Sequence, residues 1–483
     1  MIYINLSGYK RSENILDESK ELGTKNIGEL LLKFSIPAVI GMLVNALYSV
    51  VDRIFIGRGV PDPLALSGVA ITFPITNVIM AFGMLVGIGG AAVVSIKLGQ
   101  HKKEDAEKII GNAFVLVVIF SIAVSFVGLI FLEPILVLLG ASPATMPYAK
   151  QFGFIILLGV ILQNAGFGMN PFIRSEGNAV MAMVTMLIGA ILNFILNPIF
   201  IFGLHMGVVG SALATVISQA VCSIWVLSYF LRGKSLLKLR RKNMKLQKKI
   251  VKEILEIGMS PFAMQMAAGL ITVTFNKSLA KYGGDLAIGA FSLINSINML
   301  IMMPVFGLNQ GAQPIIGYNY GAKNYKRVKL ALKYAAIVAT IMTVIGFALV
   351  QIFSVQIISI FNNSDKELIN LGSKGIRIFL IMLPLIGSQV VFTNYFQAVG
   401  KAKISIFLSL LRQIIVLLPL ILLMPHFLKL DGIWMAGPTS DFISFIITTL
   451  MIVHEIKRMN KHEKKLEIIK ENREAEIAIS SIQ

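Results

Sequence analysis

Charged side chains occur inside stretches of this sequence that are otherwise apolar enough to cross a membrane. The first is Asp52, within the run FSIPAVIGMLVNALYSVVDRIFIG at residues 34–57. A carboxylate inside a membrane span costs roughly 2.5 to 3.5 kcal/mol on insertion scales. Such a residue needs a partner, a proton or a function, so Asp52 is the first candidate for chemistry.

Three other polar residues are expected at the same depth in the membrane as Asp52. At ~1.5 Å per residue, Asn193, Asn197 and Thr215 lie at a depth comparable to that of Asp52. The two amides are one helical turn apart, and Pro198 frees a backbone carbonyl beside them. A carboxylate, two amides and a hydroxyl could form a proton-exchange site or a weak cation site such as one for Na⁺. The alternative is a structural hydrogen-bond network.

A second pair of charges, Arg412 and Asp441, falls at mid-membrane depth on neighbouring antiparallel runs. Unpaired charges are unfavourable there, so we expect a buried Arg412–Asp441 ion pair. The pair would act as a structural clamp or take part in transport, and the sequence leaves both interpretations open.

Amide, methionine and aromatic side chains gather in the runs at 251–280 and 286–318. Amides in membrane helices usually face a cavity or another helix, and methionine and aromatic surfaces suit lipophilic cations. Methionine at helical spacing is also common in plain core, which is the alternative. The candidates for a substrate path are Met266, Phe291, Asn295, Asn298, Met302 and Gln310.

Motifs for nucleotide binding, metal binding and hydrolysis are absent from the sequence. It contains no GxxxxGK[ST], no HExxH and only one cysteine, Cys222. We therefore expect neither an enzyme nor a cofactor, and ATP is not the visible energy source.

The composition is that of an all-α polytopic membrane protein. Of 483 residues, 56% are apolar and 14% charged, whereas soluble domains are about a quarter charged. Apolar runs of sufficient length predict twelve transmembrane helices. They lie near 34–57, 66–96, 107–131, 146–173, 179–203, 207–231, 251–280, 286–318, 328–353, 368–398, 403–425 and 432–455.

The formal charge of +19 comes mainly from lysine and arginine in the connections on one side of the membrane. Lysine and arginine concentrate in alternate connections, above all at 232–252, while the other connections are short and nearly neutral. The positive-inside rule then predicts a multi-pass protein of the plasma membrane with both termini in the cytoplasm. Nucleic acid is not an expected partner. The 232–252 segment is a linker near anionic lipid headgroups or, alternatively, a lipid-regulatory site.

The two halves of the chain repeat. ELLLKFSIPAVIGM at 29–42 resembles EILEIGMSPFAMQM at 253–266. Six spans per repeat give both halves the same orientation, a transporter architecture with the substrate path between two bundles. The predicted domains are an N-terminal cytoplasmic segment 1–28, an N-lobe 29–231, a basic linker 232–250, a C-lobe 251–457 and a cytoplasmic tail 458–483.

Several segments together resemble the multidrug and toxic-compound extrusion (MATE) family, and within it the MepA-like bacterial branch. The resemblance covers residues 29–457, and the ordered set is more specific than any one motif. It rests on LVNALYSVVDRIFIGR (43–58), LGQHKKEDAEKIIGNAF (98–114), FIRSEGN (172–178), NFILNPIFIFG (193–203), QGAQPIIGYNYGAKN (310–324), FQAVGKAK (396–403) and GIWMAGPTSDF (432–442).

The resemblance implies two six-helix lobes forming a V and a multidrug efflux antiporter. Cationic drugs and dyes would be exported by alternating access, coupled to inward H⁺ or, alternatively, Na⁺. Asp52 resembles the acid of the family's first-lobe cation site, with Asn193 and Thr215 as companions, whereas Asn197 stands where many relatives carry a second acid. We expect a monomer among membrane lipids. The alternative function is a flippase or exporter of lipid-linked or peptide precursors.

Overall fold

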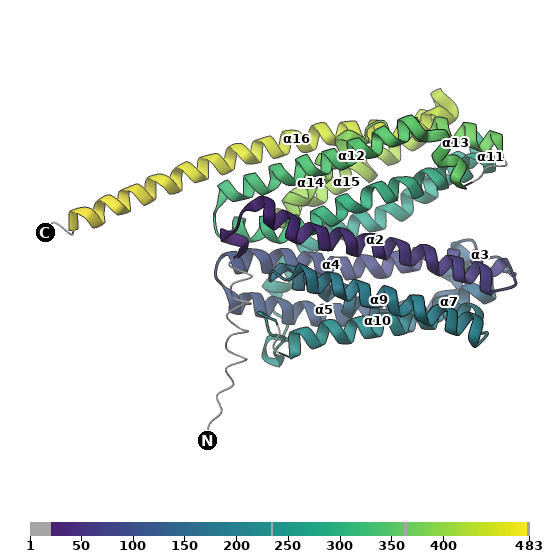
Figure 1. Cartoon of the computed structure of the whole chain (residues 1–483), viewed down its shortest axis with the longest axis horizontal. Helices are drawn as coiled ribbons and strands as arrows, with labels where there is room; N and C mark the ends of the chain where they lie inside the picture. Colours follow the sequence, from purple (N-terminus) through teal and green to yellow (C-terminus); the bar gives the residue numbers. More distant parts are fainter. Residues whose placement is uncertain (1–20, 233–234, 362–364, 481–483) are drawn as a thin grey trace, which may run out of the picture.

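The computed structural model describes residues 21–232, 235–361 and 365–480, and in these ranges all the regular structure is helical. Figure 1 shows the helices lying along one long axis, with the earlier part of the chain below the later part. The start of α2 and the projecting end of α16 lie at the same end of this bundle. We call that the basic end, because the lysine-rich connections lie there.

The first half of the chain, the N-lobe, contains nine α-helices and one π-helical turn from Ile27 onward. Their bounds are α2 (Ile27–Gly59), α3 (Leu64–Ile71), α4 (Phe73–Gly99), α5 (Lys103–Ile130), α6 (Leu132–Leu138), α7 (Met146–Leu158), α8 (Val160–Ser175), α9 (Ala179–Pro198), η1 (Ile199–Gly203) and α10 (Gly207–Leu231).

The second half, the C-lobe, follows a short 3₁₀ turn, η2 (Arg241–Asn243). Its helices are α11 (Lys248–Gly321), α12 (Tyr325–Phe361), α13 (Lys366–Phe379), α14 (Leu383–Ala398), α15 (Ala402–Leu410), the π-helical η3 (Leu411–Leu417) and α16 (Leu418–Ser480).

The described helices account for twelve membrane spans. Eight are long and apolar enough on their own, and two bent pairs, α7 with α8 and α13 with α14, raise the number to ten. The two longest stretches each contain two antiparallel spans, because α11 is broken at Gly284 and α16 at Lys429. The rings of Phe275 and Phe291 stack at 4.6 Å across the first break, whereas a straight helix would separate them by about 24 Å. The predicted all-α fold with twelve spans in two lobes is confirmed.

The lobes meet backbone to backbone in the half of the bundle nearest the basic end. α11 packs against α4 and α2, and glycines make this possible. A Cβ atom at Gly258 would lie 1.7 Å from the Leu85 carbonyl oxygen, and one at Gly99 would lie 1.9 Å from that of Tyr318. The structure is therefore a state that is closed between the lobes at the basic end.

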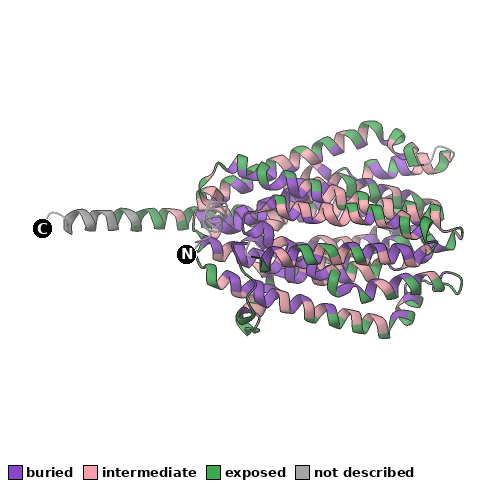
Figure 2. Ribbon diagram, turned by 60° about the horizontal axis from the view of Figure 1, so that its bottom comes forward, coloured by how far each residue is buried: buried purple, intermediate pink, exposed green. Residues whose placement is uncertain are grey.

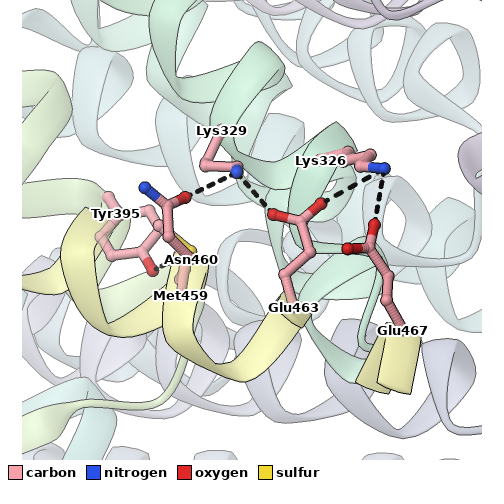
Figure 3. A network of polar contacts seen from close by, with 7 residues as sticks. All are labelled: Lys326, Lys329, Tyr395, Met459, Asn460, Glu463 and Glu467. Atoms are coloured by element: carbon pink, nitrogen blue, oxygen red, sulfur yellow. Dashed lines mark hydrogen bonds and ion pairs between the residues drawn. The ribbon is translucent and has the colours of Figure 1, made fainter. Parts of the chain in front are cut away.

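The predicted tail continues the last span as one helix. α16 runs to Ser480 and projects beyond the bundle, where its described side chains are mostly exposed (Figures 1 and 2). Where α16 leaves the bundle, it forms ion pairs with two lysines at the start of α12 (Figure 3). Lys329 contacts Glu463 at 2.6 Å, and Lys326 contacts Glu467 at 2.9 Å. Residues 1–20, 233–234 and 481–483 of the predicted cytoplasmic segments lie outside the described residues. The domain boundaries stay predictions.

Residues 235–247 of the predicted linker (232–250) pack on the N-lobe, and we call them the strap. The Asn112 amide of α5 donates to the Asn243 carbonyl at 3.1 Å and accepts from the Gln247 N–H at 2.7 Å. Glu176 accepts from the Leu237 N–H at 3.1 Å, and burial raises the pKa of its carboxyl to about 7. The strap's basic side chains remain exposed, namely Lys238, Arg240, Arg241, Lys242 and Lys245.

The Asn112→Ala variant is expected to loosen the strap. Losing the amide leaves buried backbone groups without partners, so local opening should become roughly ten-fold more frequent. The measurement is the rate of tryptic cleavage after Arg240 and Arg241 in purified protein. Asn460→Ala, at an exposed position on α16, is the matched control, and equal cleavage rates in the two variants would show that Asn112 does not hold the strap.

Candidate functional site

Asp52 of α2 lies against two other helices of the N-lobe. Its Oδ1 atom accepts hydrogen bonds from Asn197 Nδ2 of α9 and from Ser211 Oγ of α10, each at 2.9 Å. Asn197 and Ser211 are fully buried, and Asp52 is partly buried. The carboxylate is thus held by two neutral donors from two helices that are distant in sequence.

The hydrogen bonds continue from Asp52 to two further helix positions. Asn197 Nδ2 also donates to Asn193 Oδ1 at 2.7 Å, and Asn193 Nδ2 donates to Thr215 Oγ1 at 3.3 Å. The Tyr48 hydroxyl lies 3.1 Å from Thr215 Oγ1. The structure therefore brings together all four residues that the sequence singled out. With Tyr48 and Ser211 they form what we call the Asp52 cluster.

Each of three helices contributes two residues of the Asp52 cluster, spaced one turn apart. Residues four apart share one face of a helix, and this spacing joins Tyr48 to Asp52, Asn193 to Asn197 and Ser211 to Thr215. Sequence reasoning missed Tyr48 and Ser211. A search for polar residues one turn before each candidate would have found both.

The end of α9 gives the Asp52 cluster a free acceptor. α9 ends at Pro198, which lacks an N–H, and the chain continues as the π-helical turn η1. The buried Asn197 Oδ1 atom has no hydrogen-bond partner. A buried amide oxygen of this kind can accept from a donor or coordinate a cation. One carboxylate with neutral oxygens can take a proton or a monovalent cation, and the described residues contain no group of three or more His, Cys, Asp and Glu for a metal.

The C-lobe forms the expected ion pair between Arg412 and Asp441. Arg412 Nε donates to Asp441 Oδ1 at 2.6 Å, and Asp441 is 7% exposed. Arg412 lies in the π-helical η3, and its carbonyl accepts a hydrogen bond from Ser440 Oγ at 2.6 Å. Each lobe thus combines a π-helical turn with a buried carboxylate contact.

The six candidates for a substrate path do not form one site. Phe291 and Met302 are 8% and 5% exposed and pack in the hydrophobic core. Met266 and Asn295 are exposed, and the Gln310 amide reaches Met42 of α2 at 3.5 Å. All six candidates stay predictions.

Repeated bundles of membrane helices with a polar site among their helices are typical of secondary transporters. The profile of the MatE family matches this sequence twice, over residues 37–199 and 261–423. The two matches begin at Pro37 and Pro261, the positions that the internal repeat aligns. This chain therefore belongs to the MATE family of multidrug efflux transporters.

Curated relatives and solved structures agree with this assignment. The multidrug export protein MepA of Staphylococcus haemolyticus (strain JCSC1435) is 29% identical over 441 residues, which are 89% of this chain and 94% of the relative. The MATE multidrug transporter DinF-BH, solved as a complex with a ligand, is 42% identical with a TM-score of 0.84, over 89% of this chain and 96% of its own. An outward-facing MATE transporter of the MOP superfamily has the same fold, with a TM-score of 0.85 at 24% identity over 91% of this chain and 98% of its own.

Proposed function

We propose that this chain exports lipophilic organic cations by alternating access, driven by inward movement of H⁺ through the Asp52 cluster. The observation that carries the proposal is the position of Asp52, a carboxylate inside a membrane helix whose hydrogen bonds come from the neutral side chains of Asn197 and Ser211. A carboxylate in that environment can gain and lose a proton at modest cost.

Protonation of Asp52 would change how three helices hold together. A neutral carboxyl is a weaker acceptor than a carboxylate, so the bonds from Asn197 and Ser211 weaken when a proton arrives. α2, α9 and α10 can then rearrange, with Pro37 and Pro198 as bending points. Because a ligand shifts an equilibrium only through its differential affinity for two states, proton and substrate must favour opposite states.

The proposed substrate class is supported by one relative and by side chains on α2 and α11. The multidrug transporter DinF-BH, which is 42% identical to this chain, was solved with a ligand bound, and this supports a drug-sized substrate here. We place its path between the lobes, where Gln310 of α11 and Met42 of α2 meet, with Met266, Asn295 and Asn298 along α11. No cofactor is required by this mechanism.

Na⁺ is the alternative coupling ion, because the oxygens of Asn193, Asn197 and Thr215 beside Asp52 suit it as ligands. A flippase for lipid-linked precursors is less well supported, since the charge of Arg412 is neutralised by Asp441 and is not free for an anionic headgroup. We also propose that the basic end faces the cytoplasm in the plasma membrane and that the transporter acts as a monomer.

Charge selectivity in reconstituted vesicles tests the proposed substrate class. The assay compares export of a cationic dye with export of a neutral and an anionic dye of similar size under the same pH gradient. We expect export of the cation only. Equal rates for all three dyes would contradict cation export, and export of the anionic dye alone would favour the flippase.

The Ser211→Ala variant is expected to slow export by about five-fold, because the charged form of Asp52 loses one of its two donors, worth about 1 kcal/mol. Initial rates of dye export under a fixed pH gradient measure the effect. Ser218→Ala on the same helix is the matched control, since Ser218 is buried but donates to the Ala214 carbonyl. A Ser211→Ala rate equal to that of the control would remove Ser211 from the site.

A further inference from the structure

The chain segment that precedes α2 is docked on the opposite lobe. Residues 21–24 are helical, and α2 begins after the N-cap residue Asn26, whose side chain accepts from the Gly28 N–H at 2.8 Å. Leu22 is fully buried, and Gly23 lies so close to Tyr318 of α11 that a Cβ atom would be 3.0 Å from its ring. The segment is thus covalently part of the N-lobe but packs on the C-lobe.

Arg327 of α12 binds the carbonyl groups at the end of this helical turn. Its Nη2 atom donates to Lys25 O at 2.6 Å and to Leu22 O at 3.2 Å, and its Nη1 atom donates to Thr24 O at 3.5 Å. A cation at the C-terminal end of a helical turn satisfies carbonyls that have no intrahelical partner. Arg327 therefore caps a turn that belongs to the other lobe.

Asn319 of α11 positions Arg327 and adds a bond of its own. The Asn319 amide is fully buried, and its Oδ1 atom accepts from Arg327 Nε at 3.0 Å. Its Nδ2 atom donates to Leu22 O at 2.8 Å. The Leu22 carbonyl thus accepts hydrogen bonds from both Asn319 and Arg327. The Asn319 side chain also holds the Arg327 guanidinium through its Nε atom.

These bonds lie where the lobes would have to separate. About two turns before Asn319, Gly311 of α11 packs against Ser35 of α2 at a distance that leaves no room for a Cβ atom. Glu21 forms an ion pair of 2.6 Å with Lys33 of α2, so the segment is tied to α2 as well as continuous with it. If α2 moves away from α11 and carries residues 22–25 with it when the basic end opens, the bonds to Arg327 must break.

We propose that Arg327 and Asn319 form a latch that holds residues 22–25 and keeps the basic end closed between the lobes. The proposal rests on the alternating access proposed above. The latch sets the free-energy difference between the closed state and the state open at the basic end, without contact with the Asp52 cluster. Both residues are positioning residues of the transport cycle.

Labelling of a cysteine in the seam between the lobes tests the latch. Cys222→Ser removes the native thiol, and Ser95→Cys places a new one on α4, at a buried site facing Gly317 of α11. The readout is the rate of alkylation by a membrane-permeant maleimide in vesicles with no gradient and no substrate. Arg327→Ala is expected to raise this rate about ten-fold, because hydrogen bonds to charged groups are the strong ones.

Two further variants separate the latch from a general loss of stability. Arg327→Lys keeps the positive charge but replaces the several N–H donors of the guanidinium by one ammonium group. Its labelling rate should lie between those of the wild-type side chain and Arg327→Ala. Lys329→Ala, two residues along α12, breaks the contact with Glu463 (Figure 3) and should leave the rate unchanged. A rate for Arg327→Ala equal to that for Lys329→Ala would overturn the proposal, because residues 22–25 would then stay with the C-lobe while α2 bends at Asn26.

If Arg327→Ala lowers the melting temperature, faster labelling could reflect unfolding, so the distance between the lobes is measured as well. Spin labels at Lys102 and Lys323, exposed positions on opposite lobes at the basic end, report separation directly in the milder Arg327→Gln variant. A new population at longer distance is expected, and an unchanged distribution would overturn the latch. Neither readout uses ion coupling, so failure of the Asp52 mechanism would be seen separately in transport assays.

Discussion

Vesicles that contain the Asp52→Asn variant are expected to export a cationic dye under a pH gradient at less than about a tenth of the wild-type rate. A gradient can drive the lobes only through a group whose protonation differs between the two states, and asparagine does not titrate. The side-chain volume and one acceptor oxygen are retained, so the bonds from Asn197 and Ser211 can re-form and the fold should persist. The measurement is the initial rate of dye efflux.

Asp62→Asn provides the matched control for Asp52→Asn. Asp62 lies in the connection before α3, where the Tyr148 hydroxyl donates to it at 2.6 Å. The hydrogen bond lowers the pKa of this carboxyl, so at neutral pH it is already ionised and cannot exchange protons with a modest gradient. Wild-type transport by Asp52→Asn, with Asp62→Asn also active, would remove Asp52 from ion coupling.

The second large effect is expected on stability. Arg412→Met leaves Asp441 as an uncompensated buried carboxylate, and breaking a buried pair from one side costs roughly 3–5 kcal/mol. The partial exposure of Arg412, 32% for its side chain, favours the lower end of that range. Thermal unfolding in detergent measures the loss. The double variant Arg412→Met with Asp441→Leu should regain most of the stability, since neither charge remains.

An exposed ion pair serves as the reference for Arg412→Met. Lys374 of α13 contacts Asp431 at 2.7 Å, with both side chains about half exposed, and Lys374→Met should cost less than about 1 kcal/mol. Equal losses at the two pairs would contradict a buried role for Arg412. Transport by the folded double variant then separates the two interpretations of the pair, because full activity leaves only the structural clamp.

The number of spans could be predicted because length and hydropathy together identify a membrane helix in a sequence. The bend of 57° between α7 and α8 could not be predicted, since no proline stands at the break and Gly159 alone is a weak signal. The helical continuation of α16 was also missed. This charged segment contains few apolar residues, so it lacks the periodic pattern that predicts a helix. Ion pairs with Lys326 and Lys329 help to hold the part of α16 nearest the bundle.

The Asp52 cluster was partly predictable because depth in a membrane is one coordinate that the sequence supplies. Depth gave Asp52, Asn193, Asn197 and Thr215, but the angular position of each helix is set by packing. The rotation of α10 about its own axis is what turns Ser211 toward Asp52. The same missing angle explains why the burial of Phe291 could not be predicted, because periodicity does not distinguish a helix face turned to the core from one turned to a path.

Separate ion gradients applied to wild-type protein in vesicles test the central claim most directly. The claim is that one titrating carboxylate, Asp52, couples inward H⁺ to cation export. Dye export should follow a pH gradient imposed alone and should be absent with a Na⁺ gradient imposed alone at equal pH. Export driven by Na⁺ alone, or at the same rate with no gradient, would contradict the account.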